Sequence, residues 1–264
     1  MPEDKDGLTL SGLIDQLDDL VSNVPDNIES PETLPDTTRK KLRKDLLNTI
    51  DTLQNLAVTL DPVRIPDEIF DPSDPASVGK LIARTLVERP LTEFSELARF
   101  YGSGVYAIYY SGSFEAYTAI SGADIPIYVG KVDPQTTEAK TPEEQGDRLW
   151  IRLIRDHAKN IDKAENLELS DFKCRYLVVK SAWQNTAESY LINWYKPAWN
   201  NEVKICFGFG KHGDKSTTRA NTKSPWDTVH PGRPWAKDSR PNPKSSTEII
   251  QMIQAHLKSL NIND

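Results

Sequence analysis

The fold of this chain is constrained most by two short runs rich in β-branched and aromatic residues. GVYAIYY predicts a strand over 104–110, and IPIYVGK predicts a strand over 126–131. If the two strands are neighbours in one sheet, the phenol groups of Tyr106 and Tyr128 come within reach of one point. The sequence therefore predicts a sheet on which two tyrosines from separate strands converge.

The elements around these strands predict an α+β fold. A helix is expected over 147–161, a strand over 172–180 and a helix over 186–196, and the last two contain KCRYLVVK and ESYLINWY. Residues 80–101 are also expected to be helical. The long polar loop 132–147 is expected to be either disordered or functional. This order predicts a three-stranded sheet flanked by helices.

Two amphipathic segments precede this region. Residues 7–24 and 37–60 place apolar residues at alternating three- and four-residue steps, as in a coiled-coil seam, with a proline-rich turn between them. An N-terminal helical hairpin is therefore expected. It packs on itself or on the domain behind it, or it pairs with the hairpin of another subunit in a four-helix bundle.

Three regions follow from this organisation. Residues 1–75 form a helical region that is a candidate for oligomerisation, and 76–202 form the α+β core with its leading helix. Residues 203–264 form a basic, loop-rich segment that ends in a helix near 246–258. A proline-rich linker is expected over 61–79.

The net charge of −7 is unevenly distributed. Residues 1–98 carry a net charge of −10, residues 99–264 carry +3, and the window 203–240 alone carries +5. Basic patches of this kind attract phosphate groups, although solvated charge runs are also common. The distribution therefore favours a polyanionic partner for the C-terminal part of the chain.

Cysteine spacing and the N-terminus indicate the compartment. Cys174 and Cys206 lack the spacing of a metal site, which argues against zinc and favours reduced thiols. The N-terminus MPEDKDGLTL lacks the features of a signal peptide, and no apolar run is long enough to cross a bilayer. We expect a cytoplasmic protein without membrane contact.

The basic helix expected over 147–161 has two different faces. At 100° per residue, one face is a cationic stripe of Arg148, Arg152, Arg155 and Lys159. His157 projects to the apolar side. There it meets a tyrosine hydroxyl if the helix packs on the sheet, or else it is an ordinary half-buried histidine with one hydrogen bond.

These residue types together suit the hydrolysis of a phosphodiester, which makes a nuclease the leading hypothesis. The reaction needs an activated water, stabilisation of negative charge and neutralisation of the leaving oxygen. A tyrosine is a general base only if nearby cations, such as Lys131 or an arginine of the stripe, lower its pKa. His157 can take the proton onwards, and Glu188 can seat one Mg²⁺.

Glu188 and Asn200 also have local explanations. Glu188 stands three residues after Asn185, which is the spacing of a capping box at a helix start. Asn200 lies in KPAWNNE, just past the same helix, where asparagine is an ordinary turn residue. The functional assignment therefore depends on how these residues are arranged together.

The chain resembles the GIY-YIG nuclease superfamily. GVY at 104–106 and YVG at 128–130 correspond to the two tripeptides that name the superfamily, and the basic helix, the glutamate and the asparagine follow in order. The resemblance implies a small three-stranded antiparallel sheet flanked by helices, which acts as a nuclease core.

The chain is more narrowly similar to Type II restriction endonucleases of this superfamily that cut the palindrome CCGCGG. The similarity covers roughly residues 100–240 and includes GVYAIYYSG, PIYVGKV, RDHAKNIDKAENLELSDFKCRY, KPAWN, GFGKH and WDTVHPGRPWA. Residues 1–98 show no comparable likeness. The resemblance implies hydrolysis of double-stranded DNA with one Mg²⁺ per active site, and a cognate DNA methyltransferase in the same system.

The resemblance also implies roles for individual residues. Tyr106 is expected to be the general base, and Tyr128 its partner near the phosphate. His157 is expected to hydrogen-bond a tyrosine, Glu188 to hold the metal ion and Asn200 to support the site.

The arginine departs from the family pattern. Relatives usually place it four residues before the histidine, where this chain has Leu153. We expect Arg152, five residues before the histidine, to take the role through one inserted residue that is absorbed as a π-bulge. Arg148 and Arg155 are its rivals. The expected catalytic set is Tyr106, Tyr128, Lys131, Arg152, His157, Glu188 and Asn200.

Recognition of the DNA sequence must come from outside this core. The loop 132–147 and the basic segment are expected to embrace the duplex, because arginine to guanine is the commonest specific base contact. The expected DNA-contacting residues are Lys211, His212, Arg219, Lys223, His230 and Arg233. A palindromic target requires two active sites related by a two-fold axis. We therefore expect a homodimer, or a homotetramer if the N-terminal hairpins join two dimers.

Two other functions fit the same residues. A repair or homing type of GIY-YIG nuclease nicks DNA, but it usually carries an extra DNA-binding module, and none is recognisable here. Because Leu153 occupies the expected arginine position, a DNA-binding protein with an inactive nuclease core is the remaining alternative.

Overall fold

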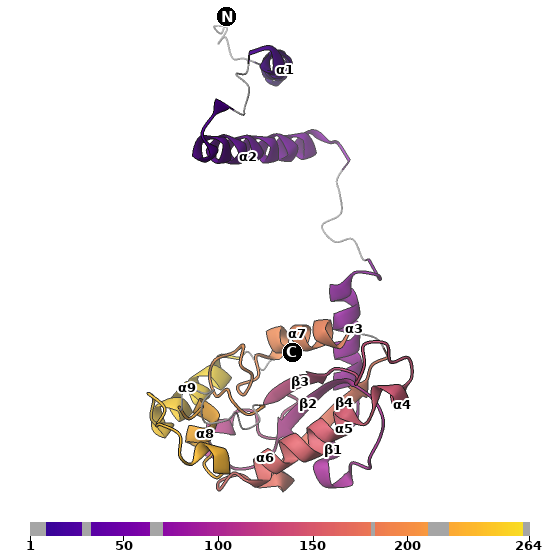
Figure 1. The fold of residues 1–264 in the computed structure, drawn as a ribbon, viewed down its shortest axis with the longest axis vertical. Helices are drawn as coiled ribbons and strands as arrows, with labels where there is room; N and C mark the ends of the chain where they lie inside the picture. The colour runs from indigo at the N-terminus through magenta and orange to yellow at the C-terminus, as the bar shows by residue number, and fades with distance from the viewer. Residues whose placement is uncertain (1–8, 28–32, 64–70, 181–182, 211–221, 261–264) are drawn as a thin grey trace, which may run out of the picture. The chain divides into compact units, whose positions relative to one another are not determined.

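The computed structural model describes residues 9–27, 33–63, 71–180, 183–210 and 222–260. The chain divides into two compact units, residues 1–69 and 70–264, which are described separately (Figure 1).

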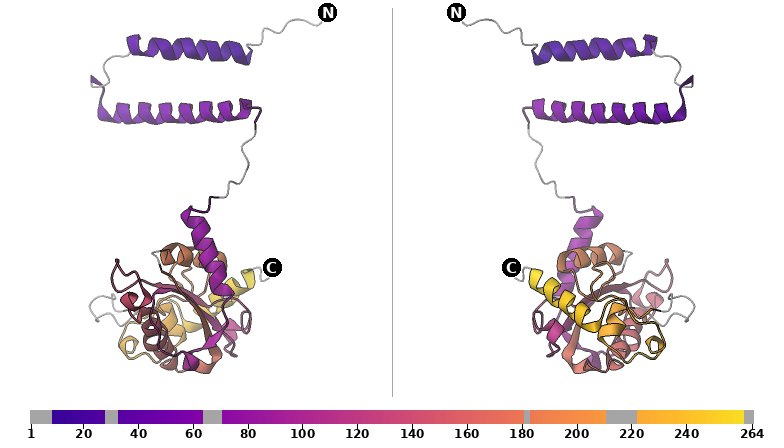
Figure 2. Two further views of the ribbon diagram at one scale, coloured as in Figure 1. Left: turned by 90° about the vertical axis from the view of Figure 1, so that its right-hand side faces the viewer. Right: turned by 90° about the vertical axis from the view of Figure 1, so that its left-hand side faces the viewer.

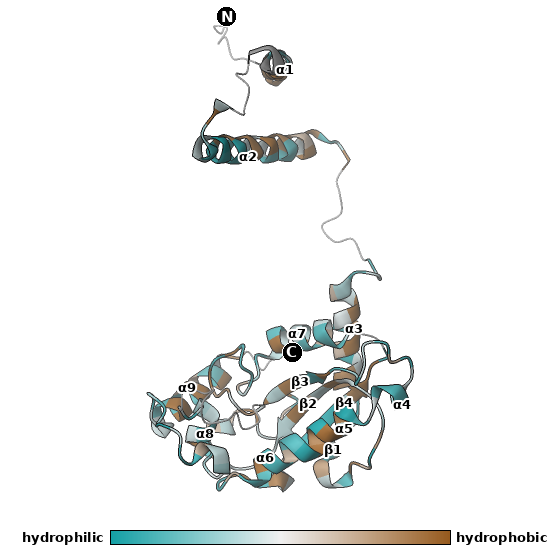
Figure 3. Ribbon diagram, viewed as in Figure 1, coloured by the Kyte–Doolittle hydropathy of each residue, from teal (hydrophilic) through white to brown (hydrophobic). Residues whose placement is uncertain are grey.

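Within residues 9–27 and 33–63, the N-terminal unit forms the helices α1 (Leu10–Asn27) and α2 (Asp36–Leu60), close to the predicted bounds. Apolar residues recur along α2, yet none of its residues is buried (Figure 3). The large exposed apolar residues include Leu10, Leu13, Ile14, Leu20 and Val21 on α1 and Leu42, Leu46, Leu47 and Ile50 on α2. The predicted N-terminal helices are confirmed, and these apolar side chains remain exposed in the described part of the unit.

In its described residues, the C-terminal unit is built on an antiparallel sheet with the strand order β1-β4-β2-β3. Its strands are β1 (Thr92–Glu93), β2 (Gly104–Tyr110), β3 (Tyr128–Val132) and β4 (Phe172–Val178). The three longer strands are those predicted, and the two-residue β1 adds an edge strand beside β4. The predicted α+β fold is therefore confirmed.

One face of the sheet is covered by two helices. β2 is central and buried along its whole length. Its residues Val105, Ala107 and Tyr109 face a layer formed by α3 (Pro75–Val87) and α7 (Gln184–Tyr195). The two helices pack side by side (Figure 2).

The opposite face carries the larger core. Tyr106, Ile108 and Tyr110 of β2 point into this core. It is covered by the basic helix and by the C-terminal part of the unit. The basic helix consists of α5 (Arg148–Trp150), a π-helix (Ile151–Ala158) and α6 (Lys159–Asp162), and the C-terminal part carries α8 (Pro225–Val229) and α9 (Ser246–Ser259).

The helix expected over 80–101 is shorter than predicted. It ends at Val87, and the chain continues through β1 into a 3₁₀ turn at Phe94–Glu96. Pro90 explains the end, because proline cannot continue an α-helix and disfavours helical geometry in the residue before it.

The same helix begins earlier than predicted, inside the linker expected over 61–79. α3 starts at Pro75, and Asp74 caps it by accepting a hydrogen bond from the Ser77 N–H at 3.0 Å. Aspartate at the cap followed by proline at the first helical position is a strong helix-start signal.

The remaining helices are short, apart from the C-terminal one. α4 (Pro142–Gln145) lies in the loop expected over 132–147. Further 3₁₀ turns occupy Glu115–Tyr117, Leu169–Asp171 and Pro234–Ala236. α9 confirms the helix expected near 246–258 and begins with a capping box between Ser245 and Glu248. None of the helices in the described ranges is long and apolar enough to span a membrane.

Candidate active site

A cavity of about 590 Å³ lies where β2, β3, the π-helix and α7 meet. Its lining includes five of the seven residues predicted to be catalytic, namely Tyr106, Tyr128, Lys131, Arg152 and Glu188. Of the other two, His157 contacts the lining residue Tyr106 from behind, and Asn200 binds the backbone of Val129, the neighbour of Tyr128 on β3. The fold therefore brings the predicted residues to one place.

Three aromatic rings pack together at this cavity: Tyr106 and Tyr128 line it, and His157 lies behind them. The ring centroids of Tyr106 and Tyr128 are 6.2 Å apart, and the ring of His157 lies 5.3 Å from the first and 5.2 Å from the second. Tyr106 Oη lies 2.6 Å from His157 Nε2, and both side chains are buried. The π-helix thus presents His157 to the sheet, and the predicted contact with a tyrosine hydroxyl is present.

The glycines of the two tripeptides have packing roles. Gly130 lies opposite Tyr106 in the β2–β3 register, and a Cβ atom there would overlap the Tyr106 hydroxyl. Gly104 has φ +155°, and a Cβ atom there would overlap the carbonyl oxygen of Leu177 on β4. Glycine is therefore required where the tyrosine ring crosses β3 and where β2 enters the sheet.

Burial dominates the acidity of both tyrosines. Desolvation raises the pKa of Tyr128 to about 12, and it raises the pKa of Tyr106 well above its ordinary value, with a further contribution from Tyr128. The Arg152 guanidinium opposes the rise of the pKa in both cases. Lys131, the other cation expected to act here, pairs through Nζ with the Asp133 carboxylate at 2.6 Å. Arg152 is therefore the cation that favours a phenolate.

Arg152 reaches the cavity because the helix is π-helical at this point. Hydrogen bonds in a π-helix join residues five apart, so a residue five positions before His157 lies one turn away. The predicted π-bulge is present, and π geometry extends over the whole of Ile151–Ala158. Arg152 Nη1 also contacts Asp156 Oδ2 at 3.2 Å.

The rival arginines differ in position. Arg148 also lines the cavity, whereas Arg155 does not, and its guanidinium lies 5.8 Å from the centroid of the Trp150 ring. The single cationic stripe predicted from 100° spacing is therefore wrong, because the wider π turn rotates Arg155 away from Arg148 and Arg152.

Glu188 and Asn200 both bind the outer edge of β3, which has no strand partner on this side of the described sheet. Glu188 Oε1 accepts a hydrogen bond from the Lys131 N–H at 3.1 Å. The buried Asn200 accepts from the Val129 N–H at 2.9 Å and donates to the Val129 carbonyl oxygen at 2.9 Å. Two side chains thus satisfy backbone groups that an edge strand would leave open.

The local explanation of Glu188 as a helix cap is wrong. α7 begins at Gln184, so Asn185 lies inside the helix. The N-cap is Trp183, and it makes no side-chain capping hydrogen bond. Glu188 therefore points to β3 and the cavity instead of back to the start of its own helix.

The chemistry of Glu188 fits a divalent cation. Burial raises the pKa of Glu188 to about 7, although the Lys131 ammonium opposes this rise. A half-buried carboxylate on an open cavity is stabilised by a cation, and Mg²⁺ usually binds one or two carboxylates while keeping several waters. No group of three or more His, Cys, Asp or Glu side chains forms a metal site in the part of the chain that the structure describes. The donor set therefore fits an ion held by one carboxylate, water and phosphate.

The predicted DNA contacts have different outcomes. Lys211, His212 and Arg219 lie outside the described residues. Lys223 is half-buried and lines a second cavity of about 390 Å³. The structure does not support His230 and Arg233 as DNA contacts, because both are buried.

Buried partners explain these two positions. His230 contacts the Tyr117 hydroxyl through Nε2 and Asn166 Oδ1 through Nδ1, and burial lowers its pKa to about 3, with a smaller effect from Arg233. Arg233 Nε donates to Asp227 Oδ1 at 2.6 Å. Both side chains belong to the interior of the C-terminal segment.

Sequence reasoning missed three residues of the site. Asp133 lines the cavity and pairs with Lys131, and their two-residue spacing along a strand was an available signal. Asp156 lines the cavity four residues after Arg152, which is a common helical ion-pair spacing. Phe209 stacks on His157 with centroids 4.7 Å apart, and nothing in its local sequence indicates this contact.

Comparison with known proteins agrees with the fold. Residues 98–257, more than half of the chain, match the family model described as the Eco29kI GIY-YIG domain. No match is found among curated proteins. The chain therefore belongs to the Eco29kI GIY-YIG family, a family of restriction-type nucleases.

Proposed function

We propose that the protein is a Type II restriction endonuclease that hydrolyses double-stranded DNA at a short GC-rich palindrome, CCGCGG. The family match supports a restriction-type nuclease. The narrower proposal rests on the segments over residues 100–240 that resemble enzymes cutting this palindrome. The observation that carries the chemistry is the single cavity shared by both tyrosines, Arg152 and Glu188.

Tyr106 is the proposed general base. Its raised pKa means that the phenol holds its proton at neutral pH. The contact with His157 Nε2 offers an acceptor for that proton. In the proposed step, the attacking water gives a proton to the Tyr106 oxygen while the tyrosine proton passes to Nε2 of His157. Tyr128, on the same cavity, orients the water or the phosphate.

In the proposed reaction, Arg152 directly and Glu188 through a bound cation stabilise negative charge on the phosphate. The guanidinium of Arg152 faces the phosphate and offsets the negative charge that develops on it. Glu188 would hold one Mg²⁺. When bound, this ion supplies neutralisation of charge on the phosphate and the leaving oxygen. Lys131 is held beside Glu188 by its pairing with Asp133.

The proposed assembly follows from the target. A palindrome presents two scissile bonds related by a two-fold axis, so a homodimer is the smallest assembly that cuts both strands at once. The exposed apolar side chains of α1 and α2 offer a surface that can join two dimers into a homotetramer. We also propose a cytoplasmic enzyme with a cognate DNA methyltransferase that protects host sites.

Incubation of supercoiled plasmid DNA with the full-length protein and Mg²⁺ tests this function. Discrete fragments that map to CCGCGG are expected, and Glu188→Gln should abolish them. Nicked circles alone would indicate a repair or homing type of nuclease. Binding without cleavage would indicate an inactive core, and discrete fragments that map elsewhere would overturn the proposed specificity.

A further inference from the structure

Phe209 forms a common wall for His157 and Tyr128. Its ring stacks on His157 with centroids 4.7 Å apart and an interplanar angle of 17°, and it meets Tyr128 edge-on at 5.1 Å. The Phe209 side chain is fully buried. A ring stacked in this way restricts rotation of the imidazole, so it keeps Nε2 of His157 directed at the Tyr106 hydroxyl.

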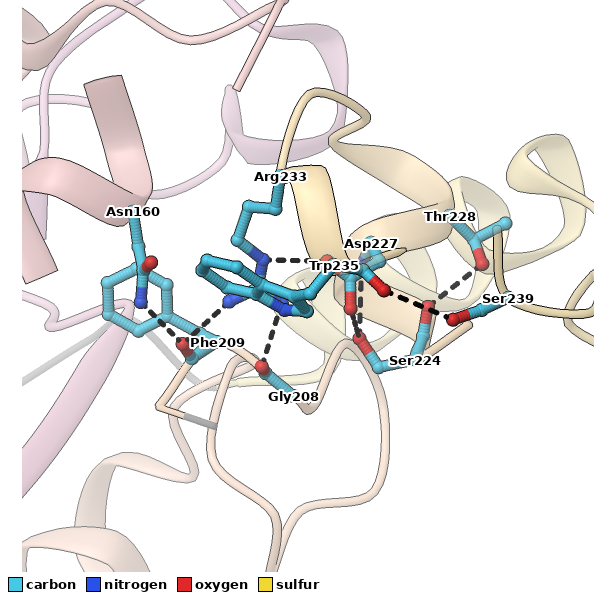
Figure 4. A network of polar contacts seen from close by, with 9 residues as sticks. All are labelled: Asn160, Gly208, Phe209, Ser224, Asp227, Thr228, Arg233, Trp235 and Ser239. Carbon is cyan, nitrogen blue, oxygen red and sulfur yellow. Dashed lines mark hydrogen bonds and ion pairs between the residues drawn. The ribbon is translucent and has the colours of Figure 1, made fainter. Parts of the chain in front are cut away.

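The backbone that carries Phe209 is held by Arg233. Arg233 Nη1 donates to the Phe209 carbonyl oxygen at 3.0 Å, and Nη2 donates to the Gly208 carbonyl oxygen at 3.0 Å (Figure 4). Asn160, on α6 just after the π-helix, donates to the same Phe209 oxygen at 3.3 Å. The segment is therefore fixed to the helix that carries His157 and to the C-terminal part of the unit.

Arg233 is itself held in place on all sides. Its Nε donates to Asp227 Oδ1 at 2.6 Å, and Asp227 Oδ2 accepts from the Ser224 hydroxyl at 2.6 Å. The guanidinium lies 4.2 Å from the centroid of the Trp226 ring and 5.1 Å from that of Trp235. A planar fork with several N–H donors can bind one carboxylate and two carbonyls at once, whereas a lysine ammonium cannot reproduce this geometry.

We propose that Arg233 is a positioning residue for the active site. Through the buried Asp227–Arg233 ion pair, it fixes the Gly208–Phe209 backbone so that Phe209 holds His157 against Tyr106. This inference deepens the proposed nuclease function and rests on it for its effect on the reaction rate. The positioning itself is a property of the protein alone and can be measured without DNA.

The chain offers a matched control for a buried arginine. Arg175 of β4 is buried, donates to the Arg89 carbonyl oxygen at 2.7 Å and pairs with Asp124 at 3.0 Å. It has the same kinds of partner as Arg233, but it binds the backbone of Arg89, whereas Arg233 binds the backbone of the residue that stacks on His157. Arg175→Lys therefore reports the general effect of weakening such an arginine.

The test is a double-mutant cycle on single-turnover cleavage by the full-length protein. Arg233→Lys should lower the rate roughly 10- to 100-fold with DNA affinity within about threefold of wild type, whereas Arg175→Lys should change the rate less than about threefold. In a His157→Gln background, Arg233→Lys should lower the cleavage rate by less than about threefold. The histidine through which Arg233 acts is already absent there. Equal losses in both backgrounds would overturn the proposal.

A second variant and a second readout keep the test independent of folding and of the nuclease assignment. Phe209→Leu removes the stacked ring and leaves the ion pair intact, and thermal melting identifies any variant that does not fold. Both Arg233→Lys and Phe209→Leu should shift the ring ¹⁵N resonances of His157, one of only four histidines in the chain. If those resonances match wild type, the positioning role is wrong. If they shift but wild type cuts no DNA, the proposed function fails and the positioning role stands.

Discussion

The Tyr106 hydroxyl lies 2.6 Å from Nε2 of His157, and both side chains are buried. Tyr106 lines the same cavity as Glu188 and Arg152. Burial alone opposes base catalysis by tyrosine, because it raises the pKa of Tyr106 well above its ordinary value. In the proposed mechanism, the contact with His157 removes this conflict. A phenol that passes its proton to an adjacent imidazole can accept another from water without existing as a free phenolate.

Tyr106→Phe should therefore abolish cleavage while leaving the ring packing intact. We expect the single-turnover rate to fall by about 10²- to 10⁴-fold, with DNA affinity little changed. The lost hydrogen bond should also cost about 1 kcal/mol of stability. Tyr117→Phe is the control, because Tyr117 makes a similar buried contact with His230 but does not line the cavity. Equal loss of cleavage in both variants would argue against a specific role for Tyr106.

Substitution of the three arginines tests which one acts on the phosphate. Arg152→Ala should lower the cleavage rate by about 10²-fold or more, since it removes a cation that faces both tyrosines. Arg148→Ala, which also lines the cavity, should cost less. Arg155→Ala should stay near wild type, because its guanidinium lies against Trp150. If Arg152→Ala alone keeps near wild-type turnover in single-turnover assays, the assignment is wrong.

Glu188 should make the metal-free protein less stable at high pH. Burial raises its pKa from 4.5 to about 7 in the folded protein. Below pH 4.5 the carboxyl is protonated in both folded and unfolded states. Between pH 4.5 and 7 the unfolded chain has lost a proton that the folded chain keeps, so stability falls as the pH rises through this window.

Thermal melting in EDTA from pH 4.5 to 8 measures this effect. Wild type should lose on the order of 1–2 kcal/mol relative to Glu188→Gln, after allowance for partial solvent screening. Mg²⁺ should restore most of that loss at pH 8, because it favours the ionised carboxylate. If the stabilities of the two proteins changed with pH in the same way, the raised pKa of Glu188 would be contradicted.

The elements that the sequence predicts well are those with local causes. The runs at 104–110 and 172–180 become β2 and β4 because their composition suits a buried sheet. The π-helix is predicted by the spacing of five residues between Arg152 and His157, where relatives have four. Proline marks both ends of α3, although only the structure shows its start at Pro75.

The failures at the candidate site depend on partners that are distant in sequence or on a change of helical period. Glu188 has the spacing of a helix cap, but its carboxylate accepts a hydrogen bond from the N–H of Lys131, which lies 57 positions away. Arg233 is predicted to contact DNA, but it is buried and binds carbonyls that lie 24 and 25 positions earlier. Arg155 leaves the predicted stripe once the turn widens. No local pattern encodes such contacts.

Asn200→Asp should destabilise the protein through the edge of β3. The substitution keeps the shape of the side chain but replaces a donor to the Val129 carbonyl oxygen with a second acceptor. The loss of one buried hydrogen bond and the repulsion that replaces it should cost about 2–3 kcal/mol. Asn201→Asp is the matched control, because Asn201 is the next residue, is exposed and should tolerate the change. Equal melting temperatures for the two variants would show that Asn200 does not hold the strand.

Removal of residues 1–69 should give a smaller assembly that still cuts DNA. The deletion must stop before α3, because Ala83 and Leu86 of that helix are buried against the sheet. The exposed apolar side chains of α1 and α2 would then be absent, and gel filtration should show a lower mass than wild type.

A double substitution distinguishes loss of the apolar surface of α2 from loss of residues 1–69 as a whole. Leu46→Asp combined with Ile50→Asp places charges on the exposed apolar side chains of α2 and should lower the mass in the same way. An unchanged mass in both variants would show that residues 1–69 do not assemble the enzyme. A mass that falls only after deletion would assign assembly to another part of this segment. Loss of cleavage together with mass would mean that the active site needs the larger assembly.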